Sequence, residues 1–311
     1  MQTIYACRTS SETTVDVLKQ SLAKALVHFY PLAGAIGLDS EGRFVVNCSK
    51  KSVAFVEAIT NCTIDMIGDL RVPDPDTSRK LVYMDPNIKS FLDLPLLTVQ
   101  VTKFRCGGFT LGLSISHTMA DGISGMTFVN SWAEITRGGS PAAPFHGRSY
   151  LQARVPPIHK GPYDDFVQMA DTSDMESLYE KERNINRMFT FSPEKIAAIK
   201  KAALADGRLR GCSTFSAVAA LDPCGHPVQV QGPTPGQLFR EPGHHHTLPH
   251  HSLSFGSSDF GWGDPAQFGC GDVARELCVF LLEGDGKKGI VVVMALPISA
   301  MNTFQELVDQ V

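Results

Sequence analysis

Residues 109–125 read FTLGLSISHTMADGISG, and this stretch decides how the chain folds. Its first half alternates apolar residues at Leu111, Leu113 and Ile115, which predicts a buried β-strand. Its second half begins a helix, because apolar residues recur there at roughly helical spacing. The helical positions are Ile123, Met126, Val129 and Trp132. The sequence therefore predicts a strand, a tight turn and a helix, in that order.

His117 stands where the predicted strand stops, and Asp121 follows four residues later, with Gly122 in the bend. A strand end is a rigid mount for a catalytic side chain. Histidine has an unperturbed pKa of about 6.5, so an imidazole there can take and return a proton near neutrality. The spacing alone fits equally well a local His–Asp pair at a helix start, and both interpretations stay open.

Composition places the chain among globular proteins with an ample core. It has 311 residues, of which 43% are hydrophobic and 19% charged, which suits one large domain or two ordinary ones. The net charge of -4 argues against nucleic-acid binding. The 8 cysteines form no C-x-x-C pair, which argues against a zinc site or a disulfide framework and favours a reducing compartment.

The first ten residues, MQTIYACRTS, lack the basic and apolar regions of a signal peptide. The apolar runs, such as residues 290–296, are too short to span a membrane. We therefore expect a cytoplasmic protein without a membrane span.

Other segments follow the same periodicities. The best helix covers residues 14–29, with Thr13 and Asp16 resembling a capping box. Residues 65–76 are polar and contain proline, which predicts a loop. Ser192 and Pro193 have the residue types of a helix start. Strands are predicted at 37–48 (a hairpin), 53–58, 96–104, 188–191, 278–282 and 290–296, and further helices at 214–221 and 299–311.

A change in amino-acid composition along the chain suggests the domain organisation. We predict an N-terminal domain over residues 1–141, a crossover over 142–187 and a C-terminal domain over 188–311. Residues 222–251 are irregular and rich in proline, glycine and histidine. The histidines of this tract invite a metal-site interpretation, but no carboxylate or cysteine is placed to complete a site, so a disordered insert is the better account. We expect no metal.

A second unusual stretch, DFGWG, lies far downstream at residues 259–263. With HTMADG and DFGWG in this order near opposite ends, the chain resembles the plant BAHD acyltransferases, which use acyl-CoA donors. Longer matching text includes LKQSLAKALVHFYPLAG, FVNSWAEITRG and CSTFSAVAA. The phrases PDPD, KLVY and SLYEKE are most similar to the family members that feruloylate omega-hydroxy fatty acids in suberin and cutin formation.

The resemblance implies an α/β fold of the chloramphenicol-acetyltransferase type, with two domains and mixed sheets. It implies that His117 is the general base that activates a hydroxyl acceptor against the acyl-CoA thioester. Acyl-CoA would be a co-substrate, with no cofactor and no nucleic-acid partner, in a monomer. The remaining motif residues would hold turns away from the reacting atoms. These structural positions are Asp121, Gly122, Asp259, Phe260, Gly261, Trp262 and Gly263.

The chain also departs from the family pattern. The block that should follow CSTFSAVAA is missing, and residues 222–251 stand in its place. The resemblance places in that block several strands and the arginines that pair with Asp121 and Asp259. Two hypotheses follow: a hydroxycinnamoyl-CoA-dependent O-acyltransferase, or a non-catalytic remnant of one with an incomplete second domain. A metal-binding protein built on the histidine tract is a weaker third.

Overall fold

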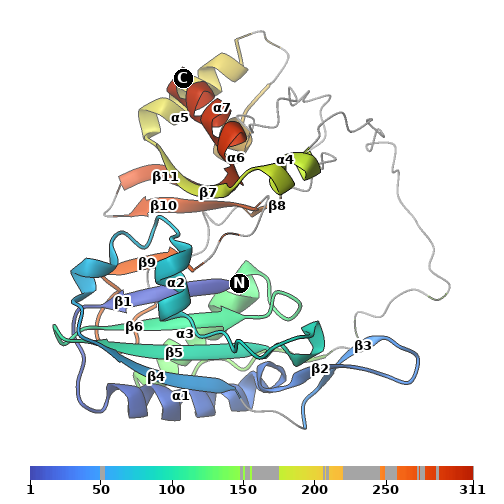
Figure 1. Ribbon diagram of the computed structural model, residues 1–311, viewed down its shortest axis with the longest axis vertical. Coiled ribbons are helices and arrows are strands. Elements are labelled where there is room, and N and C mark those ends of the chain that lie inside the picture. The colour runs from blue at the N-terminus through green and yellow to red at the C-terminus, as the bar shows by residue number, and fades with distance from the viewer. Residues whose placement is uncertain are drawn as a thin grey trace.

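The computed structural model describes residues 1–49, 53–147, 150, 155, 175–205, 207, 210–219, 246–248, 258–271, 273, 277–284 and 287–310. Its strands form two larger sheets, each with its own helices, and a small hairpin that projects from the first sheet (Figure 1).

The first sheet has five strands in the order β4-β5-β6-β1-β9. Their bounds are β1 Gln2–Cys7, β4 Ala54–Thr60, β5 Leu97–Phe104, β6 Phe109–Ile115 and β9 Gln267–Cys270. The β4–β5 pair is parallel and the other pairs are antiparallel, so the sheet is mixed. Strand β6 lies at its centre, between β5 and β1, and it leads directly to His117.

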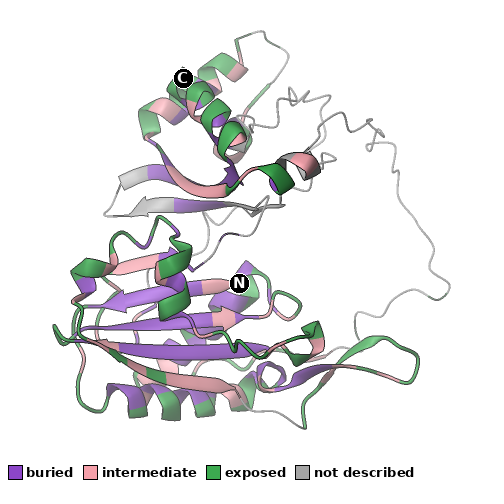
Figure 2. Cartoon of the chain, viewed as in Figure 1, coloured by how far each residue is buried: buried purple, intermediate pink, exposed green. Residues whose placement is uncertain are grey.

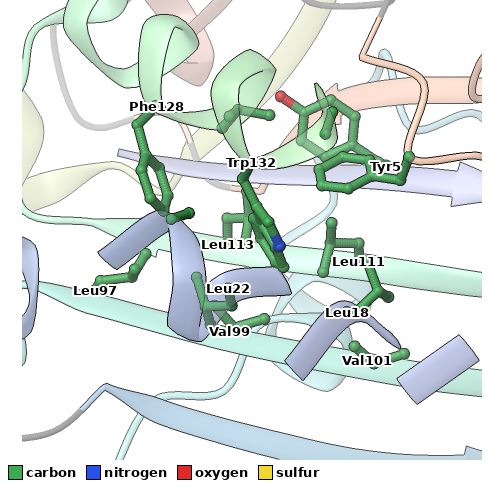
Figure 3. Packing of buried hydrophobic residues seen from close by; sticks show 14 of the residues in the cluster. Tyr5, Leu18, Leu22, Leu97, Val99, Val101, Leu111, Leu113, Phe128 and Trp132 are labelled. Atoms are coloured by element: carbon green, nitrogen blue, oxygen red, sulfur yellow. The ribbon is translucent and has the colours of Figure 1, made fainter. Parts of the chain in front are cut away.

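Two helices, α1 (Thr14–His28) and α3 (Gly122–Thr136), cover one face of this sheet. Trp132 of α3 is completely buried there, and Figure 3 shows its indole among side chains of α1 and the central strands. The indole N–H of Trp132 donates a hydrogen bond to the hydroxyl of Ser21 on α1, at 2.9 Å. This bond satisfies the indole N–H, which would otherwise be a buried donor without a partner.

The opposite face of the sheet is covered by α2 (Pro75–Leu81) and the short 3-10 helix η2 (Ile64–Ile67). The backbone of α2 approaches β6 closely at Gly112. A Cβ atom added to Gly112 would lie 1.9 Å from the carbonyl oxygen of Leu81. Glycine at this position is therefore required by the close approach of two backbones.

We expect Gly112→Ala to lower the free energy of unfolding by about 1–3 kcal/mol, because overpacking a tight contact forces the backbone to shift. Urea unfolding followed by circular dichroism measures the change. Gly37→Ala is the matched control, since a Cβ atom there would meet nothing within 4 Å. Equal stability of the two variants would contradict the close approach.

The projecting hairpin consists of β2 (Ala35–Leu38) and β3 (Phe44–Asn47), paired in antiparallel fashion. The 3-10 helix η1 (Tyr30–Ala33) joins α1 to it, and η3 (Phe91–Asp93) lies beside it through the contact of Phe44 with Phe91. A single bridge between Ala35 and Pro95 attaches the hairpin to the segment that enters β5.

The second sheet has four strands in the order β7-β11-β10-β8. Its elements are β7 Asn184–Phe191, β8 His246–Leu248, β10 Leu277–Gly284 and β11 Lys287–Pro297, with helices α4 Met175–Lys181, α5 Pro193–Ala203, α6 Thr214–Ala219 and α7 Ile298–Asp309. Helices α5, α6 and α7 share one core with this sheet. The start of α5 also contacts the backbone of α7, since the ammonium of Lys195 donates to the carbonyl of Val308 at 2.5 Å.

The other face of the second sheet is also buried. Val279 and Val293 lie there in one cluster with Met126 of α3, and Phe268 and Cys270 of β9 pack against it. Figure 2 shows purple, buried positions in the central strands of the first sheet and also in β10 of the second. The two sheets are thus joined by an apolar core, and the start of α3, close to His117, belongs to it.

The fold class expected from the sequence, an α/β chain with mixed sheets, is confirmed. The predicted hairpin, the strands that became β4–β7, β10 and β11, and the helices that became α1, α3, α5, α6 and α7 are also confirmed within a few residues. Ser192 caps α5 as predicted, since its hydroxyl accepts from the backbone N–H of Lys195. The irregular tract at 222–251 lies outside the described residues, apart from 246–248 in β8.

Two local predictions were wrong, and two strands were missed. Thr13 makes no side-chain cap on α1; instead the hydroxyl of Thr14 accepts from the backbone N–H of Ser11 at 2.7 Å. The loop predicted at 65–76 ends in α2, whose N-cap is Asp74. Strands β1 and β9 were not predicted, because β1 is buried on both faces and shows no alternation, and β9 is too short to show a period.

The position of DFGWG also differs from the sequence-based division. We assigned residues 259–263 to the C-terminal domain, whereas the structure packs them against the first sheet, where β9 then pairs with β1. Residues 259–270 therefore pack on the first sheet, and β10 of the second sheet follows them in the chain. The remaining boundaries at 141 and 187 stay a prediction.

Candidate functional site

His117 lies in a turn immediately after β6, as the sequence predicted. The carbonyl of Ser116 accepts from the backbone N–H of Met119 at 3.0 Å, which closes the turn around His117. The hydroxyls of Ser116 and Thr118 are 2.8 Å apart. The side chain of His117 is exposed, and no hydrogen bond joins its imidazole to another residue within the described part of the chain. Its ring nitrogens can therefore receive a proton from a ligand.

The strand that carries His117 is held on both sides. Ile115 exchanges two backbone hydrogen bonds with Met1, of 2.8 and 2.9 Å. On the other side, the N–H of Ser116 donates to the carbonyl of Leu96 at 2.9 Å. The turn therefore begins from a fixed point at the centre of the sheet, which is the rigidity that a proton-transferring group needs.

Asp121 is the N-cap of α3. Its carboxylate accepts a hydrogen bond of 2.7 Å from the backbone N–H of Ser124. This bond, with smaller contributions from the Ser124 side chain and the charge of His117, lowers the pKa of Asp121. Asp121 therefore fixes the turn after His117, because it binds a backbone N–H that has no partner within the helix.

We expect Asp121→Ala to lower the free energy of unfolding by about 1 kcal/mol, the usual cost of a lost N-cap. Asp121→Asn is the matched control, because asparagine caps as well as aspartate. The pKa of Asp121 is lower in the folded state than the value of about 3.9 expected in the unfolded chain. The ionised carboxylate therefore stabilises the fold at any pH above that unfolded value. This stabilisation is lost as the pH falls through the folded-state pKa. Urea unfolding at neutral pH tests the pair; equal losses in both variants would contradict a capping role.

The DFGWG stretch forms a sharp turn with two glycines in the left-handed region, Gly261 at φ 100° and Gly263 at φ 84°. The carboxylate of Asp259 accepts from the backbone N–H groups of both glycines, at 2.7 and 2.9 Å. The guanidinium of Arg137, just after α3, donates to the carbonyl of Asp259. The carboxylate and the carbonyl of Asp259 therefore both accept hydrogen bonds that hold the turn.

The aromatic residues of DFGWG anchor the turn in the first core. Phe260 is buried and meets the indole of Trp132 edge-on, with ring centroids 5.0 Å apart. Trp262 is half-buried and packs edge-on against Phe109, at 5.4 Å. Just before the turn, the hydroxyl of Ser258 donates to the side chain of Asn130 on α3 at 2.7 Å.

The structure does not bring the two motifs together. Trp262 contacts Phe109, the first residue of β6, whereas His117 follows its last residue. At roughly 3.3 Å per residue, β6 places Phe109 about 20 Å from Ile115, which lies two residues before His117. DFGWG therefore lies away from His117, and its structural role stays a prediction.

The family pattern pairs Asp121 and Asp259 with arginines of the block that is missing here, and in the described ranges both aspartates have other partners. Asp121 caps α3 and Asp259 binds backbone donors, and neither carboxylate has an ion-pair partner among these residues. Sequence reasoning also missed Arg137. Its signal was a basic residue directly after the helix that starts at the HTMADG turn. In the same ranges no group of three metal-ligating side chains gathers, and no helix is long and apolar enough to cross a bilayer.

With this geometry in place, the profile of the Transferase family matches residues 3–221, well over half of the chain. The chain belongs to the Transferase family, the BAHD acyltransferases. The matched range contains the whole HTMADG turn with β1, β5, β6 and α3, and it ends one residue before the irregular tract.

Two relatives come from Arabidopsis thaliana. Omega-hydroxypalmitate O-feruloyl transferase is 42% identical over 228 residues, which is 71% of this chain and 50% of the relative. Fatty alcohol:caffeoyl-CoA acyltransferase is 34% identical over 373 aligned positions, covering 96% of this chain and 88% of the relative. The chain thus covers only half the length of the first relative.

The fold is also that of a solved family structure. Vinorine synthase superposes with a TM-score of 0.65 at 19% sequence identity, over 99% of this BAHD chain and 90% of that one. At this identity the likeness establishes the fold.

Proposed function

We propose that this chain transfers a hydroxycinnamoyl group of the feruloyl type from acyl-CoA to a hydroxyl acceptor, such as an omega-hydroxy fatty acid or a fatty alcohol. The observation that carries the proposal is His117, an exposed imidazole on a turn anchored to the centre of the first sheet. The two Arabidopsis relatives support the substrate class, since their names specify omega-hydroxypalmitate with a feruloyl group and a fatty alcohol with caffeoyl-CoA.

In this mechanism the imidazole of His117 accepts the proton of the acceptor hydroxyl as its oxygen attacks the thioester carbonyl. The tetrahedral oxyanion then collapses, and the imidazolium returns the proton to the departing CoA thiolate. The cycle needs no covalent acyl-enzyme, and acyl-CoA enters as a co-substrate. Asp121 acts from the other end of the turn as a positioning residue, because it holds α3 and thereby the segment after His117.

The proposal extends to the setting of the enzyme. We propose a cytoplasmic monomer without a metal or cofactor, because the scattered cysteines favour a reducing compartment and the family resemblance implies a monomer that uses acyl-CoA as a co-substrate. Neither nucleic acid nor a membrane span takes part in the proposed reaction.

A second candidate is a non-catalytic remnant of such an enzyme. The alignment with the fatty alcohol relative runs over 373 positions, more than the 311 residues of this chain, so that relative contains residues with no counterpart here. The family match also ends at residue 221. Both observations favour a loss of sequence after α6, where the resemblance places strands of the second domain.

One experiment separates the two candidates. The 311-residue chain is incubated with feruloyl-CoA and 16-hydroxypalmitate, and ester formation is followed by mass spectrometry while hydrogen exchange is measured on the same sample. Ester formation with protected β10 and β11 supports the acyltransferase. Folded protein without ester formation supports the remnant and overturns the proposed activity.

A further inference from the structure

The turn that carries His117 is held at both of its ends. The N–H of Ser116 donates to the carbonyl of Leu96, and the carbonyl of Ser116 accepts from the N–H of Met119, at 2.9 and 3.0 Å. Met119 is partly buried against the first core, and Ala120, which follows it, is buried. The two ends of the turn are therefore fixed by bonds and packing contacts of the first sheet.

His117 and Thr118, the two residues between these ends, lack such restraints. Both side chains are exposed, and within the described part of the chain neither residue makes a backbone hydrogen bond. One contact spans them: the hydroxyls of Ser116 and Thr118 are 2.8 Å apart, so the side chains before and after His117 are joined by a hydrogen bond. Threonine suits this bond, because its branched Cβ restricts χ1 and with it the direction of the hydroxyl.

We propose that the hydroxyl pair of Ser116 and Thr118 is a positioning element for His117. The bond closes a small ring around the backbone of His117 and so fixes the direction of its Cα–Cβ bond. The proposal rests on the proposed function, in which the imidazole must meet the acceptor hydroxyl at hydrogen-bond distance. Because a small misplacement of a proton-transferring group lowers the rate strongly, a fixed turn raises kcat.

Thr118→Val tests the pair, since it keeps the branched shape and removes the hydroxyl. We expect kcat for ester formation from feruloyl-CoA to fall by about 2–10-fold with KM unchanged, the range that a single hydrogen bond supports. Thr118→Ser retains a hydroxyl and should restore most of the loss. Thr127→Val is the matched control, because the exposed Thr127 on α3 donates its hydroxyl proton to the carbonyl of Ile123, at 2.9 Å. This control should keep the kcat of the unmodified chain.

Two combined variants show whether the pair acts through His117. Ser116→Ala together with Thr118→Val should lose no more than either single change, because each change alone breaks the same bond. In a His117→Ala chain, Thr118→Val should not lower the residual turnover further, since a positioning residue acts only through the imidazole. Losses that multiply in either combination, or a rise of KM in place of a fall of kcat, would overturn the proposal.

Backbone amide relaxation, measured by NMR, tests the pair without any turnover. The order parameters of the His117 and Thr118 amides should be roughly 0.85 in the unmodified chain, and should fall below about 0.6 in Thr118→Val but not in Thr127→Val. A chain that forms no ester would refute the proposed function, and the hydroxyl pair is then judged by this measurement alone. Order parameters that are low in the unmodified chain, or unchanged in Thr118→Val, would overturn the proposal whether or not ester forms.

Discussion

His117→Ala is expected to lower kcat/KM for ester formation from feruloyl-CoA by roughly 10²–10⁴-fold, the usual contribution of a general base. The loss follows from the proposed reaction, in which the imidazole accepts the proton of the acceptor hydroxyl. The fold should be unaffected, because the side chain of His117 is exposed and makes no hydrogen bond to the rest of the described chain. Steady-state kinetics beside thermal melting measure both quantities.

The control for this variant is His28→Ala. His28 is exposed on α1, and within the described ranges its side chain makes no hydrogen bond; its carbonyl is 2.8 Å from a ring nitrogen of His146. The control should keep the turnover of the unmodified chain. Near-normal turnover by His117→Ala would show that the base lies elsewhere. A pH profile that loses its acidic limb only in His117→Ala would identify the titrating group directly.

Trp132→Ala should produce the largest loss of stability, about 3–5 kcal/mol of the free energy of unfolding. The residue is completely buried, bonded to Ser21 and packed edge-on against Phe260. Truncation leaves a cavity where α1, α3, the sheet and the DFGWG turn meet (Figure 3). A domain is stable by only about 5–15 kcal/mol, so the variant should be close to unfolding.

Two comparisons test this account. Trp132→Phe should lose less, because the aromatic contacts remain and the hydroxyl of Ser21 keeps its hydrogen bond from Thr136 at 2.9 Å. Ile59→Ala, at a side chain that is 85% exposed on the edge strand β4, should change stability by no more than about 0.5 kcal/mol. Urea unfolding gives all three values. A loss in Trp132→Ala as small as in Ile59→Ala would contradict a core that depends on this indole.

The position of the candidate site could be predicted from the sequence because its signals are local. Alternation at Leu111 and Leu113 reports a strand, and the apolar period after Gly122 reports a helix, so His117 had to stand at their junction. Asp121 has the right residue type and spacing for an N-cap, and its partner in the structure is the backbone N–H of Ser124. Resemblance to the BAHD family added the chemistry that local patterns do not contain.

Only the tertiary structure decided which distant segments support that site. Strand β1 pairs with both β6 and β9, so residues 2–7 and 267–270 form one sheet with the strand of His117. Strand β1 shows no alternation because it is buried on both faces and has no polar side to mark its period, and β9 is too short to show one. The contact of Phe260 with Trp132 likewise joins residues far apart in the chain. Local periodicity indicates which face of a strand or helix is buried. Which distant element packs against that face is decided by the folding of the whole chain.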